Sequence, residues 1–399
     1  MSELNIAIVG HIDHGKSTLL GRLLFDTDNI SKSKKEGLNI DVVDNINFAY
    51  LLDSFEQEQK QGKTINSMRV AVDINNRSCI FFDVPGHAEY IDRMITSISK
   101  VDYALIVIDV LQGIQEQTIH HLNILSLFEV RNITVVINKM DRINCSKEQF
   151  SEIEKQINKI CKELRINIDN IIPISAQKGI NVVKNQNLCK WYTGLSVIES
   201  LISMKIEKET SRSDFVFSVQ DIYEISGVKY IAGKVLSGSM DKGSDEVLNI
   251  INKEKYKIIN IKNNSGDCIN EINRGDLALV QLNDEANVKR GDILMDGSDI
   301  VYSTKKISLD IVWTGDEKYD ESKQYYVNVA TQAASCQIVL QKELYINKNR
   351  KNKDKGNLFK GIVALDNKIA VSKYDELDEL GTVTILNKGT IVAIGIVSK

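Results

Sequence analysis

Several features that mark membrane or secreted proteins are missing from this chain of 399 residues. It has no run of about eighteen apolar residues, so the sequence predicts no membrane-spanning segment. Residues 1–4 lead directly into an expected strand, and we therefore expect no signal peptide. These absences predict a cytoplasmic protein that has no membrane partner.

Cysteine and proline are scarce. The six cysteines are scattered and form no Cys-x-x-Cys pair, so we expect neither a zinc site nor a disulfide framework. Reduced thiols in a cytosolic protein are the simpler interpretation. The cysteines are Cys79, Cys145, Cys161, Cys189, Cys268 and Cys336, and the only prolines are Pro85 and Pro173.

The bulk composition is that of an ordinary folded protein, with 43% hydrophobic and 26% charged residues. The length suggests two or three domains. A net charge of −4 gives the chain no general attraction for nucleic acid, although an acidic protein can carry a local basic patch.

Strand and helix signals alternate through residues 1–208, which we expect to form the first domain. Apolar strands separated by helices predict an α/β fold, a mostly parallel sheet with helices on both faces. The expected strands cover residues 5–9, 78–82, 103–110, 133–137 and 171–174, and the expected helices cover residues 17–25, 89–99, 116–128 and 147–164.

Short β-rich segments with turn signals between them fill the second half. This spacing predicts two small β-barrels, over residues 209–299 and 300–399. Examples of such segments are residues 214–219, 230–235, 277–280 and 308–313. The charged run at residues 347–355 is most simply a solvated loop, with a phosphate- or RNA-binding role as the alternative.

Residues 10–17 match a complete phosphate-binding loop, Gly-x-x-x-x-Gly-Lys-Ser, between an expected strand and an expected helix. Glycines let backbone N–H groups curl around phosphate oxygens, and the helix N-terminus favours their negative charge. Lys16 would contact the β and γ phosphates, and the Ser17 hydroxyl would bind Mg²⁺. We expect His11 and His14 to shape the loop. The nucleotide-binding residues predicted here are Gly10, His11, Asp13, His14, Gly15, Lys16, Ser17 and Thr18.

Asn138-Lys139-Met140-Asp141 follows an apolar strand and predicts guanine as the base. The Asp141 carboxylate can accept hydrogen bonds from guanine N1–H and the 2-amino group, a donor pair that adenine lacks. Asn138 would join this loop to the phosphate loop, and the Lys139 stem would cover the base. The backbone N–H groups of Ser175 and Ala176, after another strand, suit guanine O6.

Two further segments are candidates for switches that the γ phosphate orders. In Asp83-Val84-Pro85-Gly86, Asp83 would hold Mg²⁺ through water, while Pro85 and the Gly86 N–H would line the γ-phosphate site. Thr64 would supply a second hydroxyl to the metal in the GTP state.

His87 directly follows Gly86. A side chain at this position can orient the attacking water for in-line displacement, so His87, Lys16 and Thr64 are the catalytic candidates. His120 and His121 are adjacent in an expected helix and therefore point apart, which argues against a paired metal site.

With these motifs in place, the chain resembles the translation-factor class of GTPases over essentially its whole length. Within that class it is most similar to the large, GTP-hydrolysing subunit of bacterial sulfate adenylyltransferase. Residues 51–65, residues 191–194 and the segment Leu309-Asp310-Ile311-Val312-Trp313 carry this second resemblance.

The resemblance implies a GTPase that uses GTP and Mg²⁺ and has a small adenylyl-transferring partner subunit. The partner would make adenylyl sulfate from ATP and sulfate, and GTP hydrolysis on this chain would help to drive that uphill reaction. Three alternatives stay open. One is a translation-factor-like GTPase that delivers aminoacyl-tRNA, with RNA as its partner. The second is a GTPase switch without a catalytic partner, and the third is a paralogue that drives a related transfer.

Overall fold

The computed structural model describes residues 3–27, 29, 48, 69–75, 77–83, 101–130, 132–183, 189–204, 214–225, 227–243, 246–263, 265–283, 286–297, 299–315, 318–345 and 358–398. The chain folds into two compact units, Met1–Glu207 and Lys208–Lys399.

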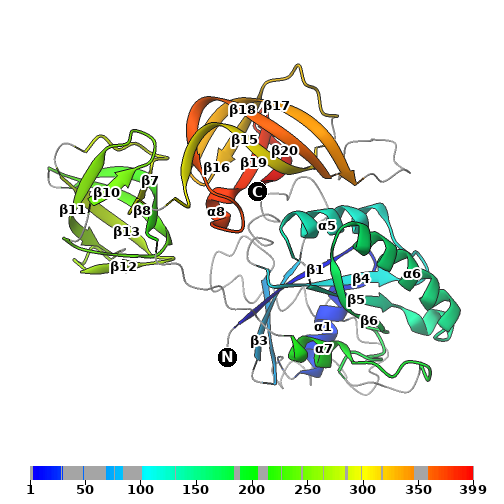
Figure 1. Cartoon of the computed structure of the whole chain (residues 1–399). Helices are drawn as coiled ribbons and strands as arrows, with labels where there is room; N and C mark the ends of the chain where they lie inside the picture. The colour runs from blue at the N-terminus through cyan, green and yellow to red at the C-terminus, as the bar shows by residue number, and fades with distance from the viewer. Residues whose placement is uncertain are drawn as a thin grey trace. The chain divides into compact units, whose positions relative to one another are not determined.

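The first unit is built on a six-stranded sheet with the strand order β2-β3-β1-β4-β5-β6 (Figure 1). Neighbouring strands are parallel except at the edge, where β2 runs antiparallel to β3. The carboxyl ends of five strands therefore meet at one edge of the sheet, where ligands bind in such folds. The strands are β1 (Leu4–Gly10), β2 (Arg69–Ile74), β3 (Arg77–Asp83), β4 (Tyr103–Asp109), β5 (Asn132–Asn138) and β6 (Asn167–Pro173).

Helices pack on both faces of this sheet. Figure 1 shows α1 and α7 on one face and α5 and α6 on the other. Leu19, Leu20, Leu23 and Leu24 of α1 are fully buried against the sheet, as expected from their helical spacing. The helices are α1 (Lys16–Asp26), α5 (Glu116–Leu127), the 3₁₀ turn η3 (Met140–Ile143), α6 (Lys147–Glu163) and α7 (Val197–Ser203).

The second unit contains two closed six-stranded barrels. The first has the order β10-β11-β13-β8-β7-β14, and the second has the order β15-β18-β17-β16-β19-β20. Strands of the first are β7 (Val216–Ile225), β8 (Val228–Ser237), β10 (Glu246–Asn249), β11 (Lys255–Lys262), β13 (Leu277–Leu282) and β14 (Ile293–Met295), beside a ribbon of β9 (Ser239–Asp241) and β12 (Glu271–Asn273). Strands of the second are β15 (Tyr302–Trp313), β16 (Tyr325–Val329), β17 (Gln332–Tyr345), β18 (Leu358–Val371), β19 (Thr382–Asn387) and β20 (Thr390–Val397), with the short helix α8 (Asp378–Gly381).

The first barrel has a hydrophobic core of its own, and a second buried cluster extends across both barrels. Val216 and Leu236 of the first barrel belong to the same buried cluster as Trp313 and Val371 of the second. Polar contacts also cross between them. Lys234 Nζ lies 3.1 Å from Glu379 Oε1, and the Thr331 hydroxyl donates to the Val219 carbonyl at 2.9 Å.

The predicted fold class, an α/β GTPase-type domain followed by two small β-barrels, is confirmed by the sheet and by the two closed barrels. The domain boundaries expected at 208/209 and 299/300 stay a prediction. The expected helix over residues 89–99 and the charged run at residues 347–355 lie outside the described residues.

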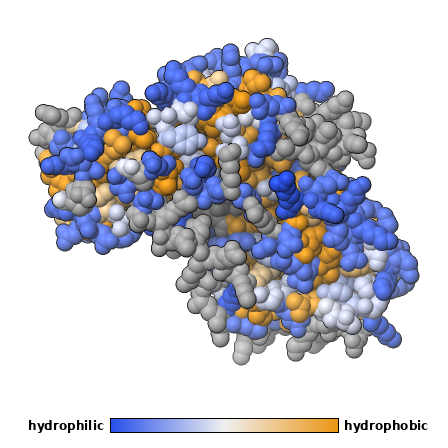
Figure 2. Space-filling model, in the orientation of Figure 1, coloured by the Kyte–Doolittle hydropathy of each residue, from blue (hydrophilic) through white to orange (hydrophobic). Residues whose placement is uncertain are grey.

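Hydrophilic residues cover most of the described surface on the face drawn in Figure 2, with hydrophobic residues in small groups between them. Among the described helices, none combines the length and the apolar character needed to cross a bilayer.

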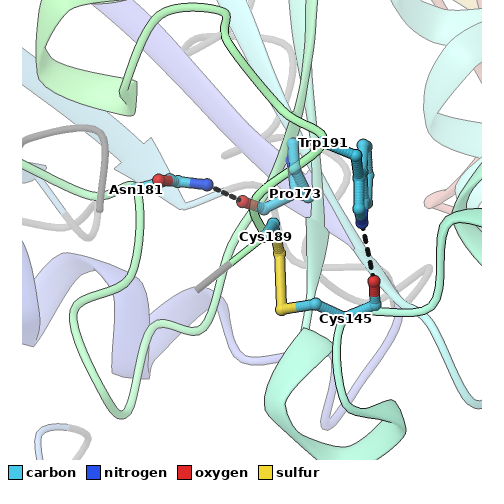
Figure 3. The surroundings of a disulfide bond; sticks show 5 residues. All are labelled: Cys145, Pro173, Asn181, Cys189 and Trp191. Atoms are coloured by element: carbon cyan, nitrogen blue, oxygen red, sulfur yellow. Dashed lines mark hydrogen bonds between the residues drawn. A yellow bond between two sulfur atoms is a disulfide. The ribbon is translucent and has the colours of Figure 1, made fainter. Parts of the chain in front are cut away.

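One expectation about the cysteines is wrong. Cys145 and Cys189 are joined by a disulfide, with their Cα atoms 5.3 Å apart (Figure 3). The fold brings Cys145, which lies just after η3, next to a segment 44 positions later in the sequence, a proximity that no local pattern signals. Of the remaining cysteines, Cys79, Cys161 and Cys336 are buried free thiols and Cys268 is an exposed one.

Candidate nucleotide-binding site

The phosphate loop joins the end of β1 to the start of α1 and depends on two glycines. Gly10 has a φ of +152°, and a Cβ there would lie 2.4 Å from the Val107 carbonyl oxygen. Gly15 has a φ of +96°, and its Cβ would lie 2.4 Å from Asn138 Nδ2. Neither position therefore has space or suitable backbone geometry for a side chain.

Lys16 is the first residue of α1. Its ammonium donates to the carbonyls of Gly10 and His11, at 2.9 and 3.1 Å, and is thereby held over the loop. The first helical hydrogen bond runs from the Leu19 N–H to the Gly15 carbonyl at 2.9 Å. The N–H groups of Ser17 and Thr18 come before this bond, in the turn where a helix offers no backbone acceptor, and a phosphate can take that place.

Two histidines of the phosphate loop form hydrogen bonds that hold the loop against neighbouring elements. His11 Nδ1 is hydrogen-bonded to Gln117 Oε1 of α5 at 2.8 Å, and the Ile12 N–H donates to the same oxygen at 3.2 Å. His14 is fully buried, with Nδ1 at 3.2 Å from the Val107 carbonyl. Burial lowers the pKa of His14, so its ring is neutral at pH 7.

Asn138, at the end of β5, connects three segments through one side chain. Its Nδ2 donates to the His14 carbonyl at 2.9 Å. Its Oδ1 accepts the Lys139 N–H at 2.8 Å and the Ala176 N–H at 3.0 Å. The phosphate loop, residues 138–141 and the loop at residues 175–180 are therefore fixed relative to one another.

Lys139 adopts a left-handed backbone conformation, with φ +62°. Its ammonium lies 2.8 Å from Asp109 Oδ2 and donates to the Asp13 carbonyl at 2.7 Å. The Lys139 stem thus runs from residues 138–141 to the phosphate loop. Asp109, the last residue of β4, is 1% exposed and also accepts the Leu111 N–H at 2.8 Å. The predicted site includes neither Asp109 nor Gln117.

Asp141 lies in η3, with 13% of its side chain exposed. Its carboxylate is 3.9 Å from the exposed Arg142 guanidinium, a separation at which an ion pair contributes little. The Ser175 N–H donates to the Ile180 carbonyl at 3.2 Å, and the Ala176 N–H donates to Asn138. Both N–H groups predicted to meet guanine O6 therefore already have acceptors within the protein.

The switch candidates are only partly covered by the described residues. Asp83 ends β3, and its Cα pairs with that of Ile8 on β1, at the same edge of the sheet as the phosphate loop. Thr64, Pro85, Gly86 and His87 lie outside the described residues, so their roles stay predictions. Within the part of the chain that is described, no three His, Cys, Asp or Glu side chains converge to hold a metal ion.

Two family models match this chain. The elongation factor Tu GTP binding domain matches residues 1–259, and the GTP-eEF1A C-terminal domain-like family matches residues 306–398.

Curated relatives fall into two groups. Sulfate adenylyltransferase subunit 1 of Bacteroides fragilis is 31% identical over 342 residues, which are 84% of this chain and 71% of that protein. The protein of the same name from Aliivibrio fischeri is 29% identical over 408 residues, covering 99% and 85% of the two chains. Elongation factor 1-alpha of Methanocella arvoryzae is 33% identical over 253 residues, covering 62% and 59%.

Proposed function

Because this chain belongs to the family of GTPases defined by the elongation factor Tu GTP binding domain, we propose that it hydrolyses GTP to drive sulfate activation. The proposal rests on the share of this chain that its relatives match. Relatives named sulfate adenylyltransferase subunit 1 match up to 99% of this chain, across the GTPase domain and both barrels. The elongation factor 1-alpha relative matches 62%.

The described loops suit a guanine nucleotide. Lys16 would move its ammonium from two loop carbonyls to the β and γ phosphates, where the charge of the nucleotide is concentrated. Asp141 would accept from N1–H and the 2-amino group of guanine. The Ala176 N–H would share its hydrogen between Asn138 and guanine O6, in a three-centre bond.

The residues near the phosphate loop suit Mg²⁺, which prefers hard oxygen ligands and keeps several waters. Ser17 lies in the first turn of α1, which follows the phosphate loop after β1, and Asp83 ends β3, the parallel neighbour of β1. They would hold the metal, joined by Thr64. The ion would supply positive charge that offsets the negative charge of the phosphates.

For hydrolysis, we propose that His87 orients the attacking water, while Lys16 stabilises charge on the transferred phosphoryl group. The Gly86 N–H and Pro85 would contact the γ-phosphate side of the site. This arrangement couples hydrolysis to the order of both switch segments.

The reaction that consumes this free energy would take place on a small partner subunit in a cytoplasmic heteromer. That subunit would bind ATP and sulfate and form adenylyl sulfate and diphosphate. The sequence contains one phosphate-binding loop, which is already assigned to GTP. We therefore propose that the second nucleotide, ATP, is bound by the partner.

A second candidate function is delivery of aminoacyl-tRNA by a translation-factor-like GTPase, with RNA as the partner. The match to elongation factor 1-alpha, at 33% identity over 253 residues, favours it. Both candidates use the same GTP site, so only the coupled partner separates them.

The decisive experiment is purification of this chain from its native host, with identification of the associated proteins. We expect a small subunit, and adenylyl sulfate formation from ATP and sulfate that GTP stimulates. Lys16→Ala in this chain should remove the stimulation and spare the unstimulated reaction. GTP-dependent retention of charged tRNA, without adenylyl sulfate formation, would favour the second candidate instead.

A further inference from the structure

A buried arginine connects the phosphate-loop helix to the loop at residues 175–180. Arg22 lies on α1 among four buried leucines, and it is only 9% exposed. Its guanidinium donates through Nε to Asp26 Oδ2 at 2.6 Å and through Nη1 to the Gln177 carbonyl at 3.2 Å. The guanidinium carbon also lies 5.1 Å from the centre of the Phe48 ring.

The loop is shaped to receive this guanidinium. At Gly179, with φ +72°, a Cβ would lie 2.4 Å from the guanidinium carbon. The loop is itself closed by paired backbone hydrogen bonds between Ser175 and Ile180. A charge buried in this way is costly unless its contacts are satisfied, so the arrangement fixes the loop in one position.

Hydrogen bonds and the backbone between them form a closed ring of contacts. Gln177 directly follows Ala176, whose N–H donates to Asn138 Oδ1. Asn138 Nδ2 donates to the His14 carbonyl, and His14 leads through Gly15 into α1, which carries Arg22. Of the described contacts in this ring, the one from Arg22 to Gln177 is the link between the helix and the loop at residues 175–180.

We propose that Arg22 is a positioning residue for purine selection, because it sets where the Ala176 N–H meets the 6-oxo group of guanine. The inference rests on the proposed function, since it assumes that the pocket binds guanine nucleotides. Arg22 itself would not touch the nucleotide. It would act through the Gln177 carbonyl and the closed loop.

The test compares three nucleotides on the full chain: GDP, 6-thio-GDP and IDP. The thio analogue changes only the 6-oxo group, and IDP lacks only the 2-amino group that Asp141 would recognise. In the wild-type protein we expect GDP to bind more tightly than either analogue. Arg22→Lys keeps the positive charge near Asp26 but loses the planar guanidinium that donates to two acceptors at once. In this variant the preference for GDP over 6-thio-GDP should fall about tenfold.

The preference for GDP over IDP should be unchanged in the same variant, because Asp141 lies on a different loop. Gly179→Ala is a second variant that tests the same contact, because its methyl group would overlap the Arg22 guanidinium and displace it. It should reduce the same preference. Arg77→Lys is the matched control, because Arg77 also donates to backbone carbonyls, those of Leu201, Ile202 and Met204, away from the proposed site.

The melting temperature of each variant, measured alongside, separates loss of folding from loss of selectivity. If Arg22→Lys and Gly179→Ala are folded and keep the wild-type preference for GDP over 6-thio-GDP, the inference is overturned. It is also overturned if both preferences fall together, because the effect is then general. Equal binding of GDP and ADP by the wild-type protein would instead overturn the proposed function, and the inference with it.

Discussion

The side-chain amide of Asn138 donates to the backbone carbonyl of His14 at 2.9 Å, although 124 residues separate them in the sequence. This contact joins residues 138–141 to the phosphate loop. Under the proposed function, a nucleotide that spans both segments would meet two loops that are already held together, which would reduce the ordering that binding requires.

Replacing Asn138 with alanine should weaken both folding and nucleotide binding. The change leaves the His14 carbonyl and the Ala176 N–H buried without the Asn138 amide, so we expect a loss of about 2–4 kcal/mol in the free energy of unfolding. GDP affinity should fall more than about tenfold. Urea unfolding and fluorescent-nucleotide titration measure the two effects.

Asn170→Ala is the control for that variant, because the Asn170 side chain joins β6 to α7 instead, with Nδ2 donating to the Ser200 hydroxyl at 3.0 Å. Its GDP affinity should stay at the wild-type value. Equal effects of the two substitutions on GDP affinity would contradict a linking role for Asn138.

Gly15→Ala should disrupt the phosphate loop. The new methyl group would lie 2.4 Å from Asn138 Nδ2 at a φ of +96°, so strain and a steric clash both act. We expect a loss of at least about 2 kcal/mol in unfolding free energy and no measurable GDP binding in calorimetry. Gly113→Ala also has a positive φ, +68°, but open space around it, and should retain binding. Binding by both variants would argue against the close contact.

Asp141→Asn should change the base that is preferred. An amide can donate where xanthine has a carbonyl, so affinity should move from guanosine toward xanthosine nucleotides, by about tenfold or more in the ratio. Competition of GDP and XDP against a fluorescent nucleotide measures this ratio. An unchanged ratio would remove Asp141 from the base site. Asp221→Asn on the first barrel provides a neutral comparison.

Removing the disulfide should lower stability through the unfolded state. The bridge closes a loop with a sequence separation of 44, for which chain entropy gives about 4 kcal/mol. Cys145→Ser should therefore unfold at lower urea concentration than the oxidised wild-type protein, and a reductant should bring the two together. Cys268→Ser, at an exposed free thiol, should have no effect. A wild-type protein insensitive to the reductant would speak against the bridge.

Stability should fall in mild acid because of buried histidines. His121 is 1% exposed, and neither ring nitrogen has a hydrogen-bond partner among the described residues. Burial, with the nearby charges of His120, Lys16 and His11, holds the pKa of His121 well below its usual value. The unfolded state then takes up a proton below about pH 6.5 that the folded state does not.

The free energy of unfolding should therefore decrease as pH falls below about 6.5, by up to about 1.4 kcal/mol per pH unit for each such histidine. His14, whose pKa is also lowered by burial, contributes in the same direction. His121→Leu should reduce the slope, as measured by urea unfolding at several pH values. The same slope in the variant would exclude His121 as a cause.

Much of the fold could be predicted from sequence because its core strands are strongly apolar. The expected strand at residues 103–110 is β4, and the expected helix at residues 147–164 is α6, each within one residue at its ends. The edge strand β2 was not predicted, although its buried and exposed residues alternate strictly. Its period of two was a usable signal. The capping box of Ser196 and Glu199 likewise marks the unpredicted α7.

The candidate site was less accessible to sequence reasoning wherever its contacts are long-range. Gly15 and Lys16 follow a local motif, so their positions could be predicted. Arg22 has no such signal, because a single cation in a leucine-rich helix is more often on the surface. Its partner carbonyl lies 155 residues later. The Cys145–Cys189 bridge was missed for the same reason.

The buried cluster that extends across the two barrels has a practical consequence for the design of fragments of this protein. A fragment cut between β14 and β15 would separate Val216 and Leu236, each at most 3% exposed in the intact chain, from the second-barrel members of their buried cluster. Hydrophobic surface exposed in this way promotes aggregation. Truncated versions of the protein should therefore keep both barrels on one polypeptide, and neither barrel should be expressed alone.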